Sequence, residues 1–287
     1  MTGAGVTVAV LDSGYDATHP ALKDVTQAKN FSDEPDITDG VGHGTHVASI
    51  VAGAGEKYRG VAPGAKIALG KVGGEYAGES AILAGMEWAA TEVKAKIINV
   101  SIGSLDIPGI DPLEHAVDTL SARTGALFVI AAGNDGVPGS VSSPGSAEAA
   151  LTVGAVDRSD RMADFSSRGP KLGDHAIKPD ATAPGLDIMA AAAQGTADGP
   201  YAAHSGTSMA APHVAGAAAI LAQRHPDWNG QQLKAALIGS SAPQPAPRTS
   251  TRGPGAWTWS GRSGSRCSPV PRTSARSSAG ADPASGR

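Results

Sequence analysis

The chain has 287 residues, of which 41% are hydrophobic, and no apolar run in it is long enough to cross a membrane. Its single cysteine, Cys267, excludes an intramolecular disulfide framework, and no paired Cys and His spacing predicts a zinc site. Residues 1–240 carry 16 Lys and Arg against 26 Asp and Glu, an acidic balance that argues against nucleic acid as the main ligand.

The end of the chain differs in composition from the rest. Residues 241–287 contain seven Arg and one Asp but no Leu, Ile, Phe, Tyr or Lys. Such a segment cannot build a core. We therefore predict one globular domain over residues 1–240 and a disordered low-complexity tail over residues 241–287. Arginine without lysine also fits an out-of-frame translation that begins near Arg248, and a flexible linker is the alternative interpretation.

Short strand-like runs alternate with longer helical patterns along residues 1–240. Apolar residues on both faces mark the strands expected over residues 6–12, 66–72, 96–103, 126–133 and 151–157. Apolar residues at helical spacing mark the helices expected over residues 43–55, 79–93 and 111–125. This alternation predicts an α/β fold, in which ligands gather at the carboxyl ends of the strands. The start of the chain has neither a basic segment nor an apolar h-region, so we expect no signal peptide in this chain.

Two polar segments lie where such a ligand site is expected. Asp12 ends the first strand, and a plain turn residue is the alternative interpretation there. His43 lies between glycines that clear side chains from one face, so a substrate backbone can approach it. His46 follows one turn later, and we interpret it as a packed or hydrogen-bonded histidine. A metal site on the two histidines is disfavoured, because no third ligand and no HExxH pattern is near.

A third polar segment, residues 204–221, reads HSGTSMAAPHVAGAAAIL and runs from small polar residues into an alanine-rich helix. Thr207 or Ser208 can cap that helix, which is the usual role of a serine at such a position. The exposed first-turn N–H groups and the helix dipole also favour an anion beside the Ser208 hydroxyl, as a developing oxyanion requires. Pro212 removes one helical hydrogen bond, a cost that a packing or functional gain should offset.

Together these segments supply an acid, an imidazole and a hydroxyl in the chain order Asp12, His43, Ser208. A serine hydroxyl becomes a good nucleophile when a base takes its proton, and a carboxylate fixes the tautomer of that base and stabilises its charged form. The α/β-hydrolases run in the order Ser, Asp, His and use a G-x-S-x-G elbow, whereas residues 206–210 read GTSMA. An elbow-type esterase is therefore disfavoured.

Over about residues 5–240 the chain resembles the subtilases, the subtilisin-like serine peptidases. The segments that carry the resemblance are, in chain order, VAVLDSG, GHGTHVAS, GVAPGAKI, INVSIGS, VIAAGN, VGAVD, FSSRGP, KPDATAPG and SGTSMAAPHVAG. The resemblance implies a three-layer subtilisin-like fold with a mainly parallel central sheet and helices on both faces. It also implies that Asp12, His43 and Ser208 form the catalytic triad.

The same resemblance assigns roles to residues around the triad. Asn134 would donate its side-chain amide to the oxyanion hole, with the Ser208 N–H as second donor, and a strand-end turn residue is the alternative for Asn134. Ser101, Ile102 and Gly103 would pair with extended substrate backbone, and a plain strand terminus is the alternative for them.

Gly133 and residues 141–145 would line the primary specificity pocket. Neither segment contains an acidic residue, so we expect a loose preference for apolar side chains rather than basic ones. The calcium-binding loop that many bacterial subtilisins insert after the first helix is reduced here to residues 56–59, so that calcium site should be absent.

An acidic stretch before the first helix is a second candidate for calcium. It contains Asp33, Glu34, Asp36 and Asp39, and we favour a solvated acidic loop over a calcium site. We therefore expect no metal site and no required cofactor. The sequence does not support a structural calcium ion.

These inferences predict a secreted serine endopeptidase of broad specificity that acts on protein or peptide substrates through an acyl-enzyme on Ser208. We expect it to be a monomer without nucleic-acid or membrane partners. The alternative is a catalytically silent, peptide-binding subtilase-like module. The intact triad and Asn134 favour the enzyme.

Overall fold

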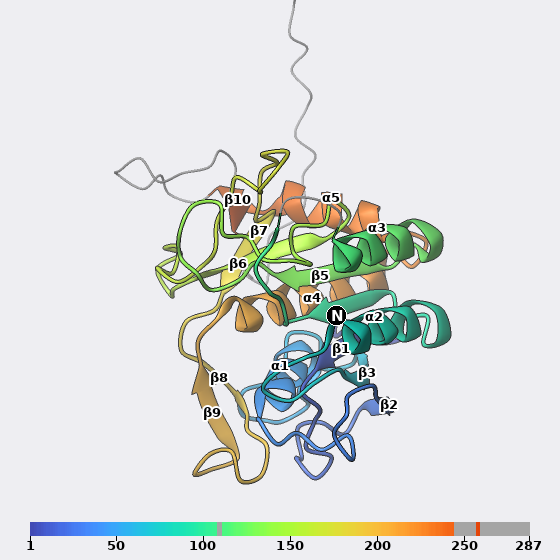
Figure 1. The fold of residues 1–287 in the computed structure, drawn as a ribbon. Helices are drawn as coiled ribbons and strands as arrows, with labels where there is room; N and C mark the ends of the chain where they lie inside the picture. Colours follow the sequence, from blue (N-terminus) through green and yellow to red (C-terminus); the bar gives the residue numbers. More distant parts are fainter. Residues whose placement is uncertain (108–110, 244–256, 259–287) are drawn as a thin grey trace, which may run out of the picture.

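The structure, a computed structural model, describes residues 1–107, 111–243 and 257–258, and its centre is a nine-stranded sheet (Figure 1). The strand order is β10-β11-β7-β6-β5-β4-β1-β3-β2, and the strands from β1 to β7 pair parallel to their neighbours. The bounds of these seven strands are, in chain order, Thr7–Asp12, Val25–Asn30, Lys66–Lys71, Ile97–Val100, Leu127–Ala131, Leu151–Val156 and Ala181–Pro184.

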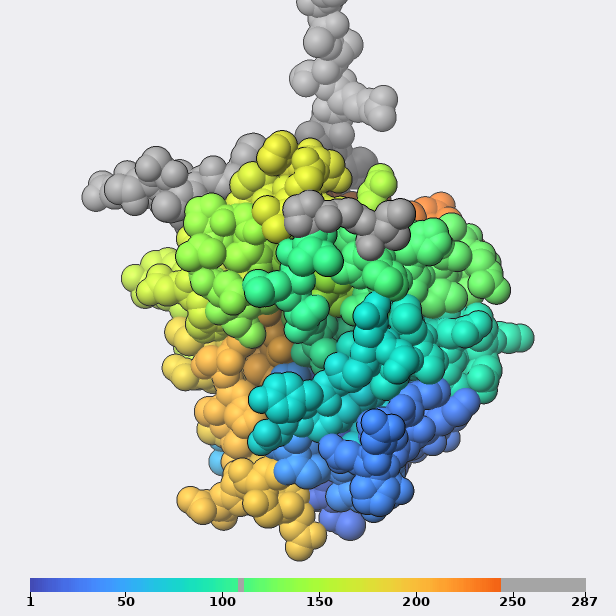
Figure 2. Space-filling view, in the orientation of Figure 1, coloured from blue at the N-terminus to red at the C-terminus, as the bar shows by residue number. Residues whose placement is uncertain are grey.

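Helices cover both faces of this sheet, as the sequence predicts. On one face lie α1 (His43–Ala52), α4 (Thr207–Arg224) and α5 (Gly230–Ser240), whose apolar side chains form one buried cluster with the strands. The other face carries a second cluster, with α2 (Glu79–Glu87), the π-helix η1 (Trp88–Glu92) and α3 (Pro112–Thr124). In the space-filling view α2 and α3 cover the sheet on the side that faces the viewer (Figure 2).

The alanine-rich composition of α4 explains its place at the centre of the molecule. The alanines on its inner side are fully buried, so the helix backbone lies close to the strands. Gly216 lets α4 pack just as closely against the segment between α1 and β3, because a Cβ at this position would lie 2.6 Å from Val61 Cβ. The packing of small residues therefore delivers the N-terminus of α4, with Thr207 and Ser208, to the carboxyl edge of the sheet.

All five strands and three helices expected from hydrophobic patterns are present, with ends that differ by a few residues. The pattern over residues 79–93 forms two elements, because the chain passes from α2 into the π-helix at Trp88. Several strands were not expected. One is β2, which is exposed and polar, and two others are β8 (Ile188–Ala191) and β9 (Tyr201–His204), which form an antiparallel hairpin beside α1.

Most of the tail expected to be disordered lies outside the described residues. In the part that the structure describes, β10 (Ala242–Pro243) and β11 (Trp257–Thr258) form a short antiparallel pair, and β11 also pairs parallel with β7. The last helix, α5, ends at Ser240, next to the expected boundary of the domain. None of the helices among the described residues is long and apolar enough to span a membrane.

A buried ion pair joins β6, β7 and α5 on one side of the sheet. Lys178 Nζ lies 2.7 Å from Asp180 Oδ2 and also donates to Ala150 O and Thr152 Oγ1, both at 2.9 Å. Burial of the ammonium lowers the pKa of Lys178 to about 8, although the charge of Asp180 opposes this effect. Lys234 from α5 adds a second ammonium 3.6 Å from Asp180 Oδ1. Asp180 is thus the shared counter-ion of two lysines, Lys178 before β7 and Lys234 on α5.

We expect Asp180→Ala to lower the free energy of unfolding by about 3–5 kcal/mol, because it leaves the buried Lys178 ammonium without a counter-ion. Urea unfolding followed by circular dichroism measures this loss. The double variant Lys178→Met/Asp180→Ala is the matched control and should recover most of the lost stability, because it removes both buried charges. A single variant as stable as the unchanged chain would contradict this role of the ion pair.

Candidate active site

A cleft of about 470 Å³ opens at the carboxyl ends of β1, β4 and β5, beside the N-terminus of α4. The structure brings every site residue expected from the sequence to the wall of this cleft. These residues are Asp12, His43, Ser101, Ile102, Gly103, Gly133, Asn134 and Ser208. Segments far apart in the chain therefore meet in one place, as the parallel sheet predicts.

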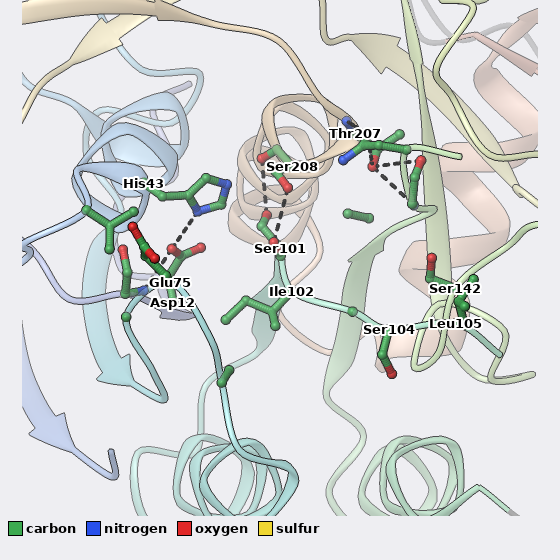
Figure 3. Close-up of a pocket in the computed structure, with 18 of the residues that line it drawn as sticks. Asp12, His43, Glu75, Ser101, Ile102, Ser104, Leu105, Ser142, Thr207 and Ser208 are labelled. Atoms are coloured by element: carbon green, nitrogen blue, oxygen red, sulfur yellow. Dashed lines mark hydrogen bonds and ion pairs between the residues drawn. The ribbon is translucent and has the colours of Figure 1, made fainter. Parts of the chain in front are cut away.

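Asp12 and His43 form a direct hydrogen bond at one end of the cleft (Figure 3). Asp12 ends β1 and is 0% exposed, and its Oδ1 lies 2.7 Å from His43 Nδ1. Because a carboxylate only accepts, Nδ1 carries the proton, and Nε2 of the neutral ring is free to accept one. Gly44 permits the contact, since a Cβ there would lie 2.2 Å from Gly14 O and 3.2 Å from Asp12 Cβ.

The environment of His43 favours its protonated form. Burial of the imidazole lowers its pKa, but the charge and the hydrogen bond of Asp12 act in the opposite direction, and so does the charge of Asp39. The net result is a pKa of His43 above the ordinary value of 6.5. The imidazole is therefore a stronger base than a free histidine, as a group that takes a proton from a hydroxyl requires.

Ser208 is held to the end of β4 by two reciprocal hydrogen bonds. Its hydroxyl donates to Ser101 O at 3.1 Å, and the Ser101 hydroxyl donates to Ser208 O, also at 3.1 Å. Pro212 explains the second bond, because it has no N–H for the Ser208 carbonyl four residues earlier. The functional gain expected to offset the cost of Pro212 is thus a Ser208 carbonyl that can accept the hydrogen bond from Ser101.

Figure 3 shows the His43 ring extending toward Ser208, yet within the described residues no hydrogen bond joins Ser208 Oγ to His43 Nε2. The hydroxyl must turn away from Ser101 to reach the imidazole. Such loose geometry is common in active sites without substrate. The Ser208 hydroxyl is therefore hydrogen-bonded to Ser101 rather than to His43 in this structure.

The amide of Asn134 has a defined orientation because Thr207 fixes its oxygen. Asn134 Oδ1 accepts from Thr207 N at 2.9 Å and from Thr207 Oγ1 at 3.1 Å. A backbone N–H only donates, so the oxygen must be the atom that faces Thr207, and Nδ2 is left to donate elsewhere. Asn134 is exposed in the wall of the cleft, where this amide is available to a ligand. The sequence pattern predicted Thr207 as a helix cap and contains no signal for its hydrogen bonds to Asn134.

The rest of the wall is built by two antiparallel segments. Ser104 N donates to Ser143 O at 3.0 Å, and this bridge joins the segment after β4 to the expected pocket segment, residues 141–145. Gly133 lies opposite Ser142, and a Cβ on Gly133 would lie 2.1 Å from Ser142 Oγ. Glu75 and Asp135 also line the cleft, and the sequence analysis did not predict either of them.

Two expectations outside the triad have clear outcomes. His46 is fully buried, and its Nε2 lies 3.0 Å from Ile188 O and 3.1 Å from Ala202 O, which confirms a packed and hydrogen-bonded histidine. The solvated-loop interpretation is wrong for Asp39, which is 2% exposed and accepts hydrogen bonds, whereas Asp33 and Asp36 are exposed. Within the described residues no group of three His, Cys, Asp or Glu side chains could hold a metal ion.

Comparisons with known proteins agree with this geometry. A family model described as the subtilase family matches residues 3–264. Subtilisin Savinase from Lederbergia lenta is 40% identical over 238 residues, which cover 82% of this chain and 82% of that protein. An alkaline protease from Alkalihalobacillus alcalophilus is also 40% identical over 238 residues, and the chain spans 58% of its length.

Solved structures give the same result at the level of the fold. A psychrophilic protease superposes with a TM-score of 0.73 at 34% identity, over 84% of both chains. A structure from Pseudoalteromonas arctica PAMC 21717, titled as proteases of that organism, superposes with a TM-score of 0.77 at 28% identity, over 90% of this chain and 88% of its own. These likenesses confirm the subtilisin-like α/β fold that the sequence predicts.

We expect Asn134→Leu to lower kcat by roughly 10²–10³-fold with little change in KM, because the role expected for Asn134 is to donate to the oxyanion of the transition state, and leucine has no donor. This is the cost known for the loss of one such donor in subtilisin itself. Steady-state kinetics on a chromogenic peptide measure both constants. A variant changed mainly in KM would assign Asn134 to substrate binding instead.

Proposed function

The chain belongs to the subtilase family of serine endopeptidases, and from that premise we propose that it hydrolyses peptide bonds of proteins through an acyl-enzyme on Ser208. The single observation that carries this proposal is the 2.7 Å hydrogen bond between Asp12 and His43 in the cleft that also contains Ser208. It gives the imidazole the tautomer and the basicity that a serine nucleophile needs.

The proposed first step is the attack of Ser208 on the scissile carbonyl. His43 Nε2 takes the hydroxyl proton while Ser208 Oγ bonds to the carbonyl carbon, whose oxygen becomes negative. Asn134 Nδ2 donates to this oxygen. The Ser208 N–H is the second donor, because as the second residue of α4 it has no acceptor within the helix.

The proposed later steps return the proton and release the products. The imidazolium of His43, stabilised by Asp12, gives its proton to the departing amine, so the peptide bond breaks and the acyl group stays on Ser208. A water molecule then attacks the acyl-enzyme with His43 again as the base, which frees the carboxylic acid and restores the Ser208 hydroxyl. No cofactor takes part in these steps.

Substrate binding is proposed along the segment after β4. Ile102 and Gly103 line the cleft, and an extended substrate backbone can pair with this segment as an added strand. The wall contributed by Ala131, Gly133 and Ser142 carries no charge, which supports a loose preference for apolar side chains. Secretion is expected from the family resemblance, and a monomer remains an expectation. The expected independence of calcium rests on a departure from the family pattern, the short segment at residues 56–59.

One observation favours a second candidate, a catalytically silent peptide-binding module. The Ser208 hydroxyl donates to Ser101 O rather than to His43 in the structure. A fluorophosphonate probe separates the candidates, because only an activated serine reacts with it. Covalent labelling of Ser208, located by mass spectrometry, supports the enzyme, and no labelling of the folded chain supports the silent module.

We expect Ser208→Ala and His43→Ala each to lower kcat on casein by about a million-fold, which is the loss known for the corresponding changes in subtilisin. Each change removes an essential member of the proposed triad, whose residues act together. Release of acid-soluble peptides measures the rate, with Ser240→Ala on α5 as a control far along the chain from the cleft. Near-normal turnover in either variant would refute the mechanism.

We also expect a peptide with Phe before the scissile bond to have a higher kcat/KM than the matched peptide with Arg, by roughly ten-fold or more, because no charge in the pocket wall offsets the desolvation of a guanidinium. Competition between the two peptides in one reaction measures this ratio directly. A ratio at or below one would assign the preference to the carboxylates of Glu75 and Asp135.

A further inference from the structure

One buried carboxylate beside the triad has no role in the proposed mechanism. Asp39 lies in the loop before α1, and it is 2% exposed although its acidic neighbours Asp33 and Asp36 are exposed. Burial of an ionised side chain costs several kcal/mol unless hydrogen bonds and charges offset it. The contacts of the Asp39 carboxylate must therefore offset the cost of its burial.

Asp39 accepts five hydrogen bonds from the start of α1 and from the end of β1. Its Oδ1 accepts from Gly42 N at 2.7 Å, from Val41 N at 3.2 Å and from Ser13 Oγ at 2.9 Å. Its Oδ2 accepts from Thr45 N at 2.8 Å and from Thr45 Oγ1 at 2.6 Å. Both oxygens face only donors, which is the pattern of an ionised carboxylate.

These contacts make Asp39 the cap of α1. The residue at the N-cap position is Gly42, which has a φ of 87° and no side chain to cap the helix. Asp39 supplies the missing acceptor from three positions earlier and binds both Gly42 N and Thr45 N. His43, the first residue of α1, lies between these two anchored positions.

Ser13 links Asp39 to Asp12, the residue that contacts His43. Its hydroxyl donates to Asp39 and accepts from Gly44 N at 2.9 Å, and its N–H donates at 2.8 Å to Asp12 Oδ1. That Asp12 oxygen is the one that contacts His43 Nδ1. A closed circuit of hydrogen bonds therefore joins Asp39, Ser13, Asp12 and the first turn of α1.

We propose that Asp39 is a positioning residue for His43, which holds the first turn of α1 against Asp12 and adds a second fixed negative charge behind the imidazole. The proposal deepens the proposed function and rests on it, because the triad is the unit that Asp39 serves. It assigns Asp39 neither to a calcium site nor to a solvated loop.

The charges around His43 set the sign of the effect. Titratable groups face the imidazole or share its cleft from its own helix and from five other segments: His46 on α1, Asp12 on β1, Asp39 before α1, His204 on β9, Glu75 after β3 and Asp135 after β5. Burial lowers the pKa of both other histidines, so they are neutral at the pH where the base is needed. The fixed charge of Asp39 favours the imidazolium, and its removal must lower the pKa of His43.

The central experiment replaces Asp39 by Asn and follows two readouts. The acid limb of the pH profile of kcat/KM should move to lower pH, and kcat should fall by about 10- to 100-fold while KM changes less, because the imidazole loses its position. In a Ser208→Ala background, titration of the ¹⁵N-labelled His43 ring by NMR should show the same downward shift. This second readout needs no activity, so it tests Asp39 even if the proposed function fails.

The matched control is Asp36→Asn, the same loss of charge in the same loop at an exposed side chain. It should leave kcat, the acid limb and the NMR titration of His43 unchanged. A folded Asp39→Asn protein whose acid limb and NMR titration match those of Asp36→Asn would overturn the proposal and reduce Asp39 to a helix cap.

A second variant keeps the proposal testable if Asp39→Asn does not fold. Ser13→Ala keeps the charge of Asp39 and removes only the hydroxyl that joins the end of β1 to Asp39 and to Gly44 of α1. It should lower kcat while the NMR titration of His43 stays in place, because position is lost and charge is not. An unchanged kcat in folded Ser13→Ala would overturn the circuit through Ser13.

Discussion

The active site depends on the hydrogen bond between a fully buried carboxylate, Asp12, and the imidazole of His43. The two hydrogen bonds that the Asp12 carboxylate accepts within the described residues, from Ser13 N and His43 Nδ1, both fall on Oδ1, and Oδ2 is buried without a partner. A carboxylate with so few donors is poorly solvated, so the hydrogen bond from His43 Nδ1 is the main side-chain contact that offsets its burial. The sheet supplies the rigid strand end that holds this carboxylate in place.

The packing of α4 serves the same site from the opposite direction. Because its inner residues are small, the helix crosses the middle of the sheet, and its N-terminus reaches the carboxyl ends of the strands. Pro212 then leaves the Ser208 carbonyl without a helical donor, and Ser101 from the end of β4 occupies it. The alanine-rich composition of α4 thus sets the position of the helix, and the position of the helix sets the place of Ser208.

Sequence patterns predicted those parts of the molecule that depend on local order. The strand over residues 6–12 and the helix that begins at His43 follow from apolar spacing, and polar residues at the ends of such elements predicted the grouping of Asp12, His43 and Ser208 that the structure places in one cleft. The polar strand β2 has no such signal, because only its pairing with β3 makes it a strand. Asp39 was misread for a different reason: four of its five donors come from residues 41–45, where the chain turns into α1, and the fifth comes from Ser13, and the spacing of acidic residues gives no sign of this turn.

The raised pKa of His43 explains when these buried charges act. A group whose pKa is raised in the folded chain contributes its stabilisation below its unfolded pKa, and this contribution is lost as the pH rises through the folded pKa. At a pH where the resting imidazole is neutral, its hydrogen bond to Asp12 remains, but the charge–charge attraction to Asp12 and Asp39 is absent from the ground state. In the proposed mechanism this charge–charge attraction returns only when His43 takes the proton of Ser208. Because an interaction made only in the transition state accelerates the reaction, the cost of burying the two carboxylates is offset at the step that needs them.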